Sequence, residues 1–487
     1  MVNILVRRPF AFGLALLSAV VTLFPVCGSA AVDYPDSLKD TVVEAADTWL
    51  ISNARLVDGV NAEPKLDQDI LISDGKIAAI GPSGSLEIPP DTPTLDAAGK
   101  TVMPGLIMVH EHLFYNDHGA VIPHYAADTV SLSALYLSHG VTSMRTGGSM
   151  NITDDLRIKN LIQAGRYPGP EIHLTAPYID GPDSPIFQLN RYESESEVRQ
   201  MVRFWADRGV SWLKGYMWVK PNILAAAIDE AHERNVKVTG HLCSVTYLEA
   251  VAMGIDNLEH GFFAATDFAA NKESGKCPSD TRAMTMLEAM MAAPEKRKAL
   301  INTLIENEVY MTSTLAVLGA GLRDYEPSEL ALSLMNQRPR ANANYMLSLF
   351  EERSDVRERR ETELLLSMAL DKEFHEAGGK LVVGTDPTGW GGTIPGPGSH
   401  SALFLLQEAG LEPMDIIKIA TRNAAEMLEV ADQTGTVRVG LDADLMLIDG
   451  EPDKDIKALT KLELVITDGV AIDGPKLAEK FKERVGR

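Results

Sequence analysis

Two histidines stand one residue apart in the segment GLIMVHEHLFY, residues 105–115. His110 and His112 follow an apolar run that predicts a buried strand. Side chains at positions i and i+2 of a strand point to the same face, so both imidazoles are expected on one side of it. Neutral imidazole is a common ligand of zinc and of other transition metals. The spacing therefore predicts part of a metal site.

Four further polar residues lie in or directly after strand-like runs. They are Lys214 in SWLKGYM, His241 in VKVTGHL, His260 in NLEHGFF and Asp386 in KLVVGTDP. Together with the first pair they supply four imidazoles, a carboxylate and an amine. Such a nitrogen and oxygen set suits divalent zinc, with manganese, iron or cobalt as alternatives.

Lys214 is at first sight a poor neighbour for cations, because they would repel its ammonium group and lower its pKa. A lysine that reacts with carbon dioxide becomes an anionic carbamate, whose two oxygens can bridge two metal ions. This chemistry would make Lys214 a ligand and gives a site for two divalent metal ions.

The elements that must position these residues follow from the rest of the middle of the chain. Residues 103–430 alternate apolar runs with helical stretches such as EVRQMVRFWADRG and NILAAAIDEAHERN. Eight runs are found: TVMPGLIMVHEH, VTSMRTGG, EIHLTAP, SWLKGYM, VKVTGHL, NLEHGFF, VYMTSTLAV and KLVVGTDP. This is the count of a (β/α)8 TIM barrel, in which the C-terminal strand ends meet at one mouth. Two long, helix-rich connections, 264–300 and 318–375, are expected to form lids or walls above it.

The two ends of the chain have a different pattern. Short β runs with Asp-Gly turns fill residues 43–102, where DILISDGKIAAIG predicts a hairpin. Similar runs, GTVRVGLDADLMLIDG and LELVITDGVAID, fill residues 431–480. We therefore expect one small, discontinuous β-sandwich domain built from both ends, and a mixed α/β protein as a whole.

The chain has 487 residues and a formal net charge of −23, which argues against a nucleic-acid surface or a polybasic membrane patch. Residues 1–30 carry two arginines, an apolar run and then small residues, the order of a secretory signal with cleavage near residues 30–31. We expect a secreted or periplasmic protein without stable membrane association. Cys27 would leave with the signal, and Cys243 and Cys277 are expected to be two free thiols rather than a disulfide.

The motifs together resemble the amidohydrolase superfamily. The resemblance rests on GLIMVHEHL, LKGYM, TGHL, LEHGF and GTDPT in this order, and on the tail TRNAAEMLEVADQTGTVRVGLDADLMLIDGEPDKDI. It covers about residues 49–475 and is greatest for the binuclear dipeptidases of the prolidase-like and Xaa-Arg types. It implies that His110, His112 and Asp386 hold one metal, that His241 and His260 hold the other, and that carboxylated Lys214 bridges them. Two positions depart from the family: Met108 stands where an Asp is common, and Thr146 replaces an acid in MRTGG.

Other side chains are candidates for substrate contacts. Arg145, at the end of the second run, is either a packed barrel arginine or a clamp for a substrate carboxylate. Tyr216 either fills the barrel or donates to a substrate carbonyl. His173 and His400 are candidates for the pocket wall, with a role in the core as the alternative.

The function predicted is hydrolysis of an amide or peptide C–N bond in a small substrate, such as a dipeptide or an N-acyl amino acid, by a hydroxide that bridges the metals. Asp386 is the expected catalytic residue, taking a proton from the hydroxide and passing it to the leaving amine. Three alternatives stay open. They are a mononuclear deaminase or cyclic-imide hydrolase of the imidazolonepropionase type, a lactone or ester hydrolase, and a non-catalytic metal- or partner-binding protein. A homo-oligomer is compatible with each.

Overall fold

The computed structural model describes residues 32–116, 124–278, 283–325, 327–389 and 392–486. The expected signal, residues 1–30, lies outside them. Within these ranges, no helix has both the length and the apolar character needed to cross a membrane.

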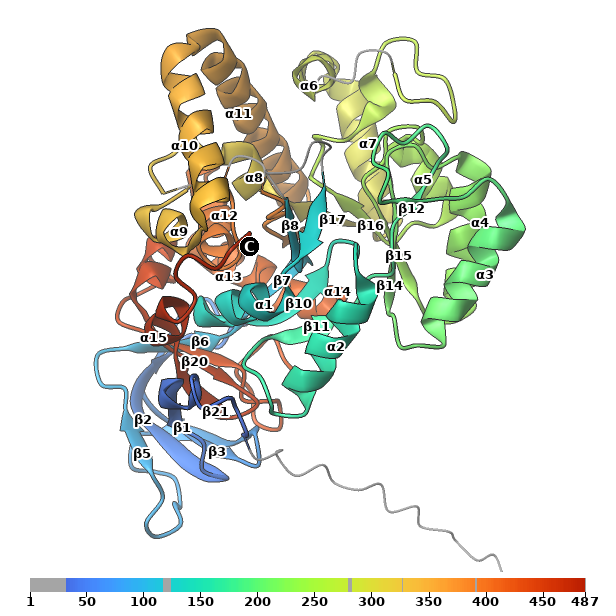
Figure 1. The fold of residues 1–487 in the computed structure, drawn as a ribbon. Helices are drawn as coiled ribbons and strands as arrows, with labels where there is room; N and C mark the ends of the chain where they lie inside the picture. Colours follow the sequence, from blue (N-terminus) through green and yellow to red (C-terminus); the bar gives the residue numbers. More distant parts are fainter. Residues whose placement is uncertain (1–31, 117–123, 279–282, 326, 390–391, 487) are drawn as a thin grey trace, which may run out of the picture.

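Both ends of the chain contribute to one nine-stranded sheet, which lies at the bottom of Figure 1 with its blue and red strands together. Its order is β1-β21-β20-β19-β6-β2-β3-β4, and β5 pairs with β2. The strands are β1 (Val42–Glu44), β2 (Thr48–Leu56), β3 (Lys65–Ser73), β4 (Lys76–Pro82), β5 (Thr94–Asp96), β6 (Thr101–Pro104), β19 (Leu445–Ile448), β20 (Leu462–Thr467) and β21 (Val470–Asp473). The predicted hairpin is confirmed as β3 and β4, where Ser73 pairs with Lys76 across the Asp74-Gly75 turn. Trp49, Ile51 and Ile70 lie in a separate apolar core on this sheet.

All eight predicted runs of the middle segment form parallel strands. A three-stranded sheet has the order β11-β10-β7, and a seven-stranded sheet has the order β13-β12-β14-β15-β16-β17-β18. The eight are β7 (Leu106–Glu111), β10 (Val141–Thr146), β11 (Glu171–His173), β14 (Trp212–Gly215), β15 (Lys237–Gly240), β16 (Asn257–Glu259), β17 (Tyr310–Ser313) and β18 (Lys380–Val383). Shorter strands are β8 (Phe114–Asn116), β9 (Tyr125–Ala127), β12 (Ile179–Asp180) and β13 (Asn190–Arg191).

Backbone hydrogen bonds join the two parallel sheets at both edges. Beside β11, the Trp212 amide donates to the Leu174 carbonyl, and the Ala176 amide donates back to Trp212. Beyond β18, the amides of Thr385 and Asp386 both donate to the His110 carbonyl of β7. Each of the eight strands therefore has a hydrogen-bonded neighbouring segment on both sides. Their C-terminal ends lie on the same side.

Helices separate the strands as the sequence predicts (Figure 1). They are α1 (Thr129–Ser138), α2 (Ile152–Gln163), α3 (Glu195–Ala206), α4 (Pro221–His232), α5 (Tyr247–Met253), α6 (Ala283–Met291), α7 (Pro294–Glu306), α8 (Leu315–Gly319), α9 (Glu329–Leu334), α10 (Gln337–Glu352), α11 (Ser354–Glu376), α12 (Pro397–Glu408), α13 (Pro413–Ile419), α14 (Arg422–Met427) and α15 (Gly474–Glu479). Three 3₁₀ turns are η1 (Lys39–Thr41), η2 (Thr266–Phe268) and η3 (Ile456–Lys461). The two helices that the periodicity predicts are confirmed as α3 and α4. Val198 and Val202 face inward from α3, and Pro221 occupies the start of α4, where its missing N–H costs nothing.

Both long connections are helix-rich, as expected. Residues 264–300 contain η2, α6 and most of α7, and residues 318–375 contain α9, α10 and most of α11. The last two helices stand side by side beyond the strand ends (Figure 1).

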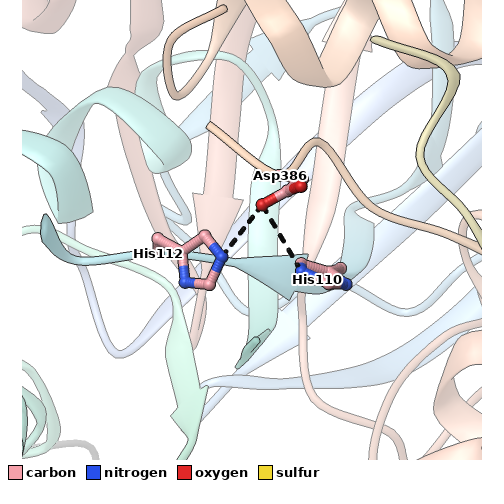
Figure 2. Close-up of side chains that lie close together, drawn as sticks. All are labelled: His110, His112 and Asp386. Atoms are coloured by element: carbon pink, nitrogen blue, oxygen red, sulfur yellow. Dashed lines mark hydrogen bonds and ion pairs between the residues drawn. The ribbon is translucent and has the colours of Figure 1, made fainter. Parts of the chain in front are cut away.

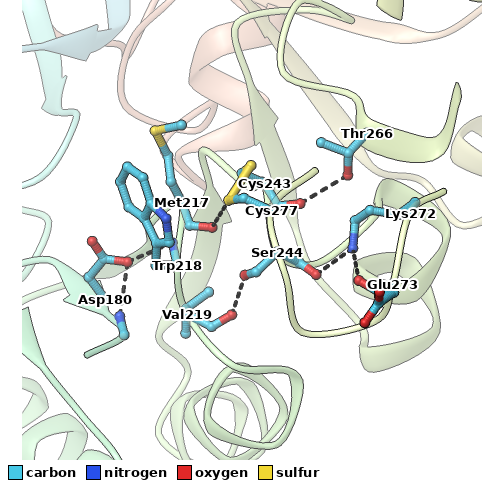
Figure 3. The surroundings of a disulfide bond; sticks show 11 residues. Asp180, Met217, Trp218, Val219, Cys243, Ser244, Thr266, Lys272, Glu273 and Cys277 are labelled. Carbon is cyan, nitrogen blue, oxygen red and sulfur yellow. Dashed lines mark hydrogen bonds between the residues drawn. A yellow bond between two sulfur atoms is a disulfide. The ribbon is translucent and has the colours of Figure 1, made fainter. Parts of the chain in front are cut away.

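The prediction of two free thiols is wrong, because Cys243 and Cys277 form a disulfide (Figure 3). Their Cα atoms are 5.0 Å apart, and 34 residues of sequence separate them. The bond ties the connection after β16 to the chain just beyond β15. The Ser244 carbonyl accepts hydrogen bonds there from the Lys272 ammonium and the Gly275 amide.

Replacing both cysteines, Cys243→Ser with Cys277→Ser, should lower the free energy of unfolding by about 2–4 kcal/mol, because the unfolded chain gains the freedom of an open loop. Urea unfolding of oxidised wild type and of the double variant measures this. Reductant should shift the wild-type midpoint and leave the variant's midpoint in place. The disulfide would be contradicted if reductant left the wild-type unfolding midpoint unchanged and mass spectrometry found no disulfide-linked Cys243–Cys277 peptides.

Candidate metal centre

His110, His112 and Asp386 meet at the C-terminal ends of β7 and β18 (Figure 2). His112 Nε2 lies 3.0 Å from Asp386 Oδ1, and His110 Nε2 lies 3.5 Å from the same oxygen. One potential ligand atom from each residue lies within 4.8 Å of the other two. This is the spacing that a single shared cation requires.

The other predicted ligands surround this trio. Lys214 Nζ lies 3.2 Å from His110 Nε2. The ring of His260 lies 4.7 Å from that of His110 and 4.4 Å from that of His241, measured between centroids. All six predicted ligands are therefore brought together.

Three of the four histidines, His112, His241 and His260, are in the neutral form that metal binding needs. Burial lowers the pKa of His112 to about 4 and that of His241 to about 3, so both rings are neutral near pH 7. Burial also holds the pKa of His260 well below its ordinary value. The buried Nε2 of His260 has no hydrogen-bond partner within the described ranges. A neutral, buried imidazole nitrogen of this kind suits a divalent cation, so the residues fit a metal.

Two of the ligands sit on strained backbone. His260 has φ of 69° and Asp386 has φ of 53°, both in the left-handed region. Such a conformation in a residue with a side chain costs about 1–3 kcal/mol and persists only where its surroundings fix it. His260 directly follows β16, and Asp386 lies three residues after the end of β18, so in each case the turn after the strand re-aims the side chain.

Two glycines allow His110 to lie where it does. A Cβ on Gly384 would lie 2.3 Å from His110 Cβ, and a Cβ on Gly147 would lie 2.7 Å from His110 Nε2. The glycines of VGTD and RTGG are thus required by close packing against the ligand.

Glu259 fixes the ring of His110. Its Oε2 is 2.6 Å from His110 Nδ1, its Oε1 accepts from Arg145 Nη2 at 2.6 Å, and Thr239 also donates to Oε1 at 2.6 Å. Burial alone would raise the pKa of Glu259, but Arg145 and His110 outweigh it and hold that pKa well below its usual range. The carboxylate therefore orients His110 with its Nε2 toward Asp386 and Lys214.

The centre lies at the wall of a cavity of about 440 Å³. His112, Lys214, His241, His260 and Asp386 line it. The volume falls in the range of pockets for small molecules, roughly 300–1,000 Å³.

The candidate substrate residues have different outcomes. Tyr216 lines the cavity, and its ring lies 5.1 Å from that of His241. Arg145 is fully buried against Glu259 and the Trp212 ring, so the carboxylate clamp is wrong and the packed alternative holds. His173 is buried on β11 beside Arg145 and does not line the cavity.

His400 also lies away from the metal centre. It sits on α12, where its Nε2 is 2.8 Å from the His139 carbonyl, and it lines a separate cavity with His139. The position of His400 after β18 suggested that it lines the pocket beside the metal centre. Instead, α12 places its side chain at the separate cavity.

Glu259, Tyr178 and the two close-packed glycines also belong to the site, although the sequence patterns did not predict them. Tyr178 lines the cavity, and its ring is 5.2 Å from that of Tyr216. An available signal for Glu259 was its place beside His260 in NLEHGFF. Met108 stands where the family often has an acid, and Glu259 on another strand supplies a carboxylate to His110.

The family model described as "Amidohydrolase family" matches residues 101–472, which is most of the chain. The chain belongs to the amidohydrolase family. The resemblance found in the motifs is thereby confirmed.

Among curated relatives of this amidohydrolase, an uncharacterized protein of Mycobacterium tuberculosis is 30% identical over 183 residues, 34% of this chain and 45% of that protein. The match thus spans less than half of that relative's length. Two solved structures share the fold. A Xaa-Pro dipeptidase with bound methionine has a TM-score of 0.63 at 20% identity, covering 88% of this chain and 100% of its own. Bottromycin amidohydrolase has a TM-score of 0.67 at 22% identity, covering 91% of each chain.

Replacing Glu259 by Gln keeps its shape and removes its charge, so His110 loses the partner that orients it. We expect metal affinity to fall about 10- to 100-fold, the usual cost of losing such a partner. Competition with a chromogenic chelator measures the affinity, and circular dichroism checks that the variant is folded. Glu171→Gln on β11 is the control and should bind metal as wild type does. A folded Glu259→Gln variant with wild-type affinity would show that the carboxylate does not support the site.

Proposed function

We propose that this amidohydrolase is a metal-dependent hydrolase that cleaves an amide or peptide C–N bond in a small substrate, such as a dipeptide or an N-acyl amino acid, outside the cytoplasm. The observation that carries the proposal is the meeting of four imidazoles, a carboxylate and an amine beside one cavity, which all of these groups except His110 line. Family membership supports the reaction class, and the shape and size of the cavity support a small substrate.

The framework in this proposal is a closed (β/α)8 barrel, residues 103–430, beside a β-sandwich domain from both chain ends, residues 43–102 and 431–480. The eight parallel strands and the hydrogen bonds that join their two sheets at both edges support it. Active sites of such barrels lie at the C-terminal strand ends, which is where the six candidate ligands are found.

His110, His112 and Asp386 would hold one divalent ion, and His241 and His260 a second, with zinc the first candidate and manganese, iron or cobalt the others. Bound cations of this kind supply Lewis acidity and make water a nucleophile near neutral pH. The contribution of the chain is a dry, preorganised set of donors.

Lys214 would bridge the two ions as a carbamate. Burial lowers the pKa of its amine to about 8, so a useful fraction is uncharged near neutral pH. The free amine adds to the carbon of carbon dioxide, a C–N bond forms, and one proton leaves to solvent. The product is an anion that fits among the neighbouring imidazoles.

Lys214→Ala should lower the metal content below two ions per chain and abolish activity, because the bridging anion is lost. Elemental analysis of the purified protein gives the metal content, and added short carboxylic acids should restore part of the activity. Lys237→Ala, at the opposite end of the neighbouring strand, is the matched control. Full metal content and full activity in Lys214→Ala would reject the carbamate. One ion per chain in wild type would favour the mononuclear alternative.

Asp386 is proposed as the proton carrier. Its Oδ1 faces both His110 and His112, and its carboxylate opens on the cavity. Burial would raise the pKa of Asp386, but His110 and His112 outweigh it and hold that pKa well below normal. The group is thus ionised near neutral pH, and its position at the cavity is what would let it take a proton from the attacking water and deliver it to the leaving nitrogen.

Asp386→Asn keeps the size and one oxygen but cannot take the proton. Turnover should fall by roughly 10²–10⁴, the usual scale of general acid–base catalysis, while metal content falls less. Steady-state kinetics with metal analysis on the same sample tests this. Near-wild-type turnover would remove Asp386 from the proton pathway.

Tyr216 and Tyr178 would contact the substrate. Both rings line the cavity beside His241 and the metal ligands. Burial raises the pKa of both phenols, so each hydroxyl keeps its proton and can donate it to a carbonyl oxygen.

A further inference from the structure

The cavity continues beyond the metal centre along an apolar wall. This wall is built by Ile186, Leu189, Phe263, Leu318, Met346 and Phe350. These side chains come from the segment between β12 and β13, from the turn after β16, and from α8 and α10. An apolar wall of this extent favours a substrate with an apolar body, because burying that body removes its surface from water.

Two arginines of α11 also line this cavity, and they differ in their contacts. Arg360 donates to Glu363 at 3.1 Å and to the Leu318 carbonyl at 3.4 Å, so it holds α8 against α11. Arg359 is exposed and has no charged or hydrogen-bonding partner within the described ranges. It is therefore an exposed guanidinium on the lining of the same cavity as the buried metal centre.

We propose that Arg359 binds a carboxylate at the end of the substrate far from the scissile bond. The substrate class is then an amide whose apolar chain or ring system ends in an acidic group. This inference rests on the proposed hydrolysis of an amide at the metal centre. It adds that the substrate carries an acidic group, which Arg359 binds, at the end far from the scissile bond.

The negative net charge of the protein makes Arg359 important for the choice between an acidic substrate and its neutral analogue. With a formal net charge of −23, the chain as a whole repels anions. An acidic substrate therefore needs a local cation to be favoured over its neutral analogue. A guanidinium offers two parallel N–H donors that match a carboxylate.

The test compares two probes that differ only at the distal end. One is the mono-anilide of octanedioic acid, which ends in a free carboxylate, and the other is its methyl ester. Release of aniline by the metal-loaded protein gives kcat and KM. Wild type should favour the acid by about 10-fold in kcat/KM, as expected for one charge-assisted contact near the surface. The preference should shrink as salt is added.

Arg359→Gln should lose this preference because KM for the acid rises, and Arg359→Glu should disfavour the acid. Arg357→Gln is the matched control, since Arg357 is an exposed arginine of the same helix that does not line the cavity. It should keep the wild-type preference.

The outcomes separate this inference from the proposed function. Equal cleavage of acid and ester by wild type would overturn the role of Arg359 and leave amide hydrolysis standing. If neither probe is cleaved, isothermal titration with the same two compounds decides. Tighter binding of the acid that Arg359→Gln abolishes would support the anion site while counting against hydrolysis of this amide. Equal binding, or none, would overturn the anion site.

Discussion

The site depends on one buried carboxylate, Glu259. A charge removed from water is tolerable only where partners replace its hydration, and Glu259 has three such partners, each at 2.6 Å. His110 and Arg145 come from the three-stranded parallel sheet, whereas Glu259 and Thr239 come from the seven-stranded one. A single carboxylate thus links both sheets through their interior and orients His110, a candidate metal ligand. Removing one member would leave the others charged or polar without a partner.

The close packing around His110 follows from this constraint. Because Glu259 fixes one face of the ring, the neighbouring strand ends must approach it without side chains of their own, and Gly147 and Gly384 meet that need. The left-handed turns at His260 and Asp386 then aim two more ligands at the same point. The energy stored in these turns is offset by the packed surroundings.

Strand patterns predicted well which candidate ligands lie close together, and predicted poorly the residues that support them. Period-two alternation places His110 and His112 on one face, and the polar ends of eight runs converge in any parallel barrel. The same alternation puts neighbours on opposite faces, yet Glu259 and His260 both serve the site because the positive φ of His260 breaks the pattern. From the sequence, the Arg145 side chain could equally contact a substrate or a buried acid. Only the position of Glu259 in the fold shows that it contacts the acid. The Cys243–Cys277 pair joins segments 34 residues apart, a distance over which local sequence carries no pairing information.

In this fold, the candidate metal ligands and the wall of the cavity come from different elements. The candidate metal ligands lie near the ends of short strands or on the turns that follow them. The hydrogen-bonded sheets fix the positions of these strands. The apolar wall and the arginines of the cavity come mostly from helices α8, α10 and α11 and from loops, which can change without moving a ligand. Solved structures at 20–22% identity share this fold, and a shared fold does not fix the wall of the cavity. The substrate of this amidohydrolase therefore has to be argued from its own wall, where Arg359 lies exposed on the lining of the cavity.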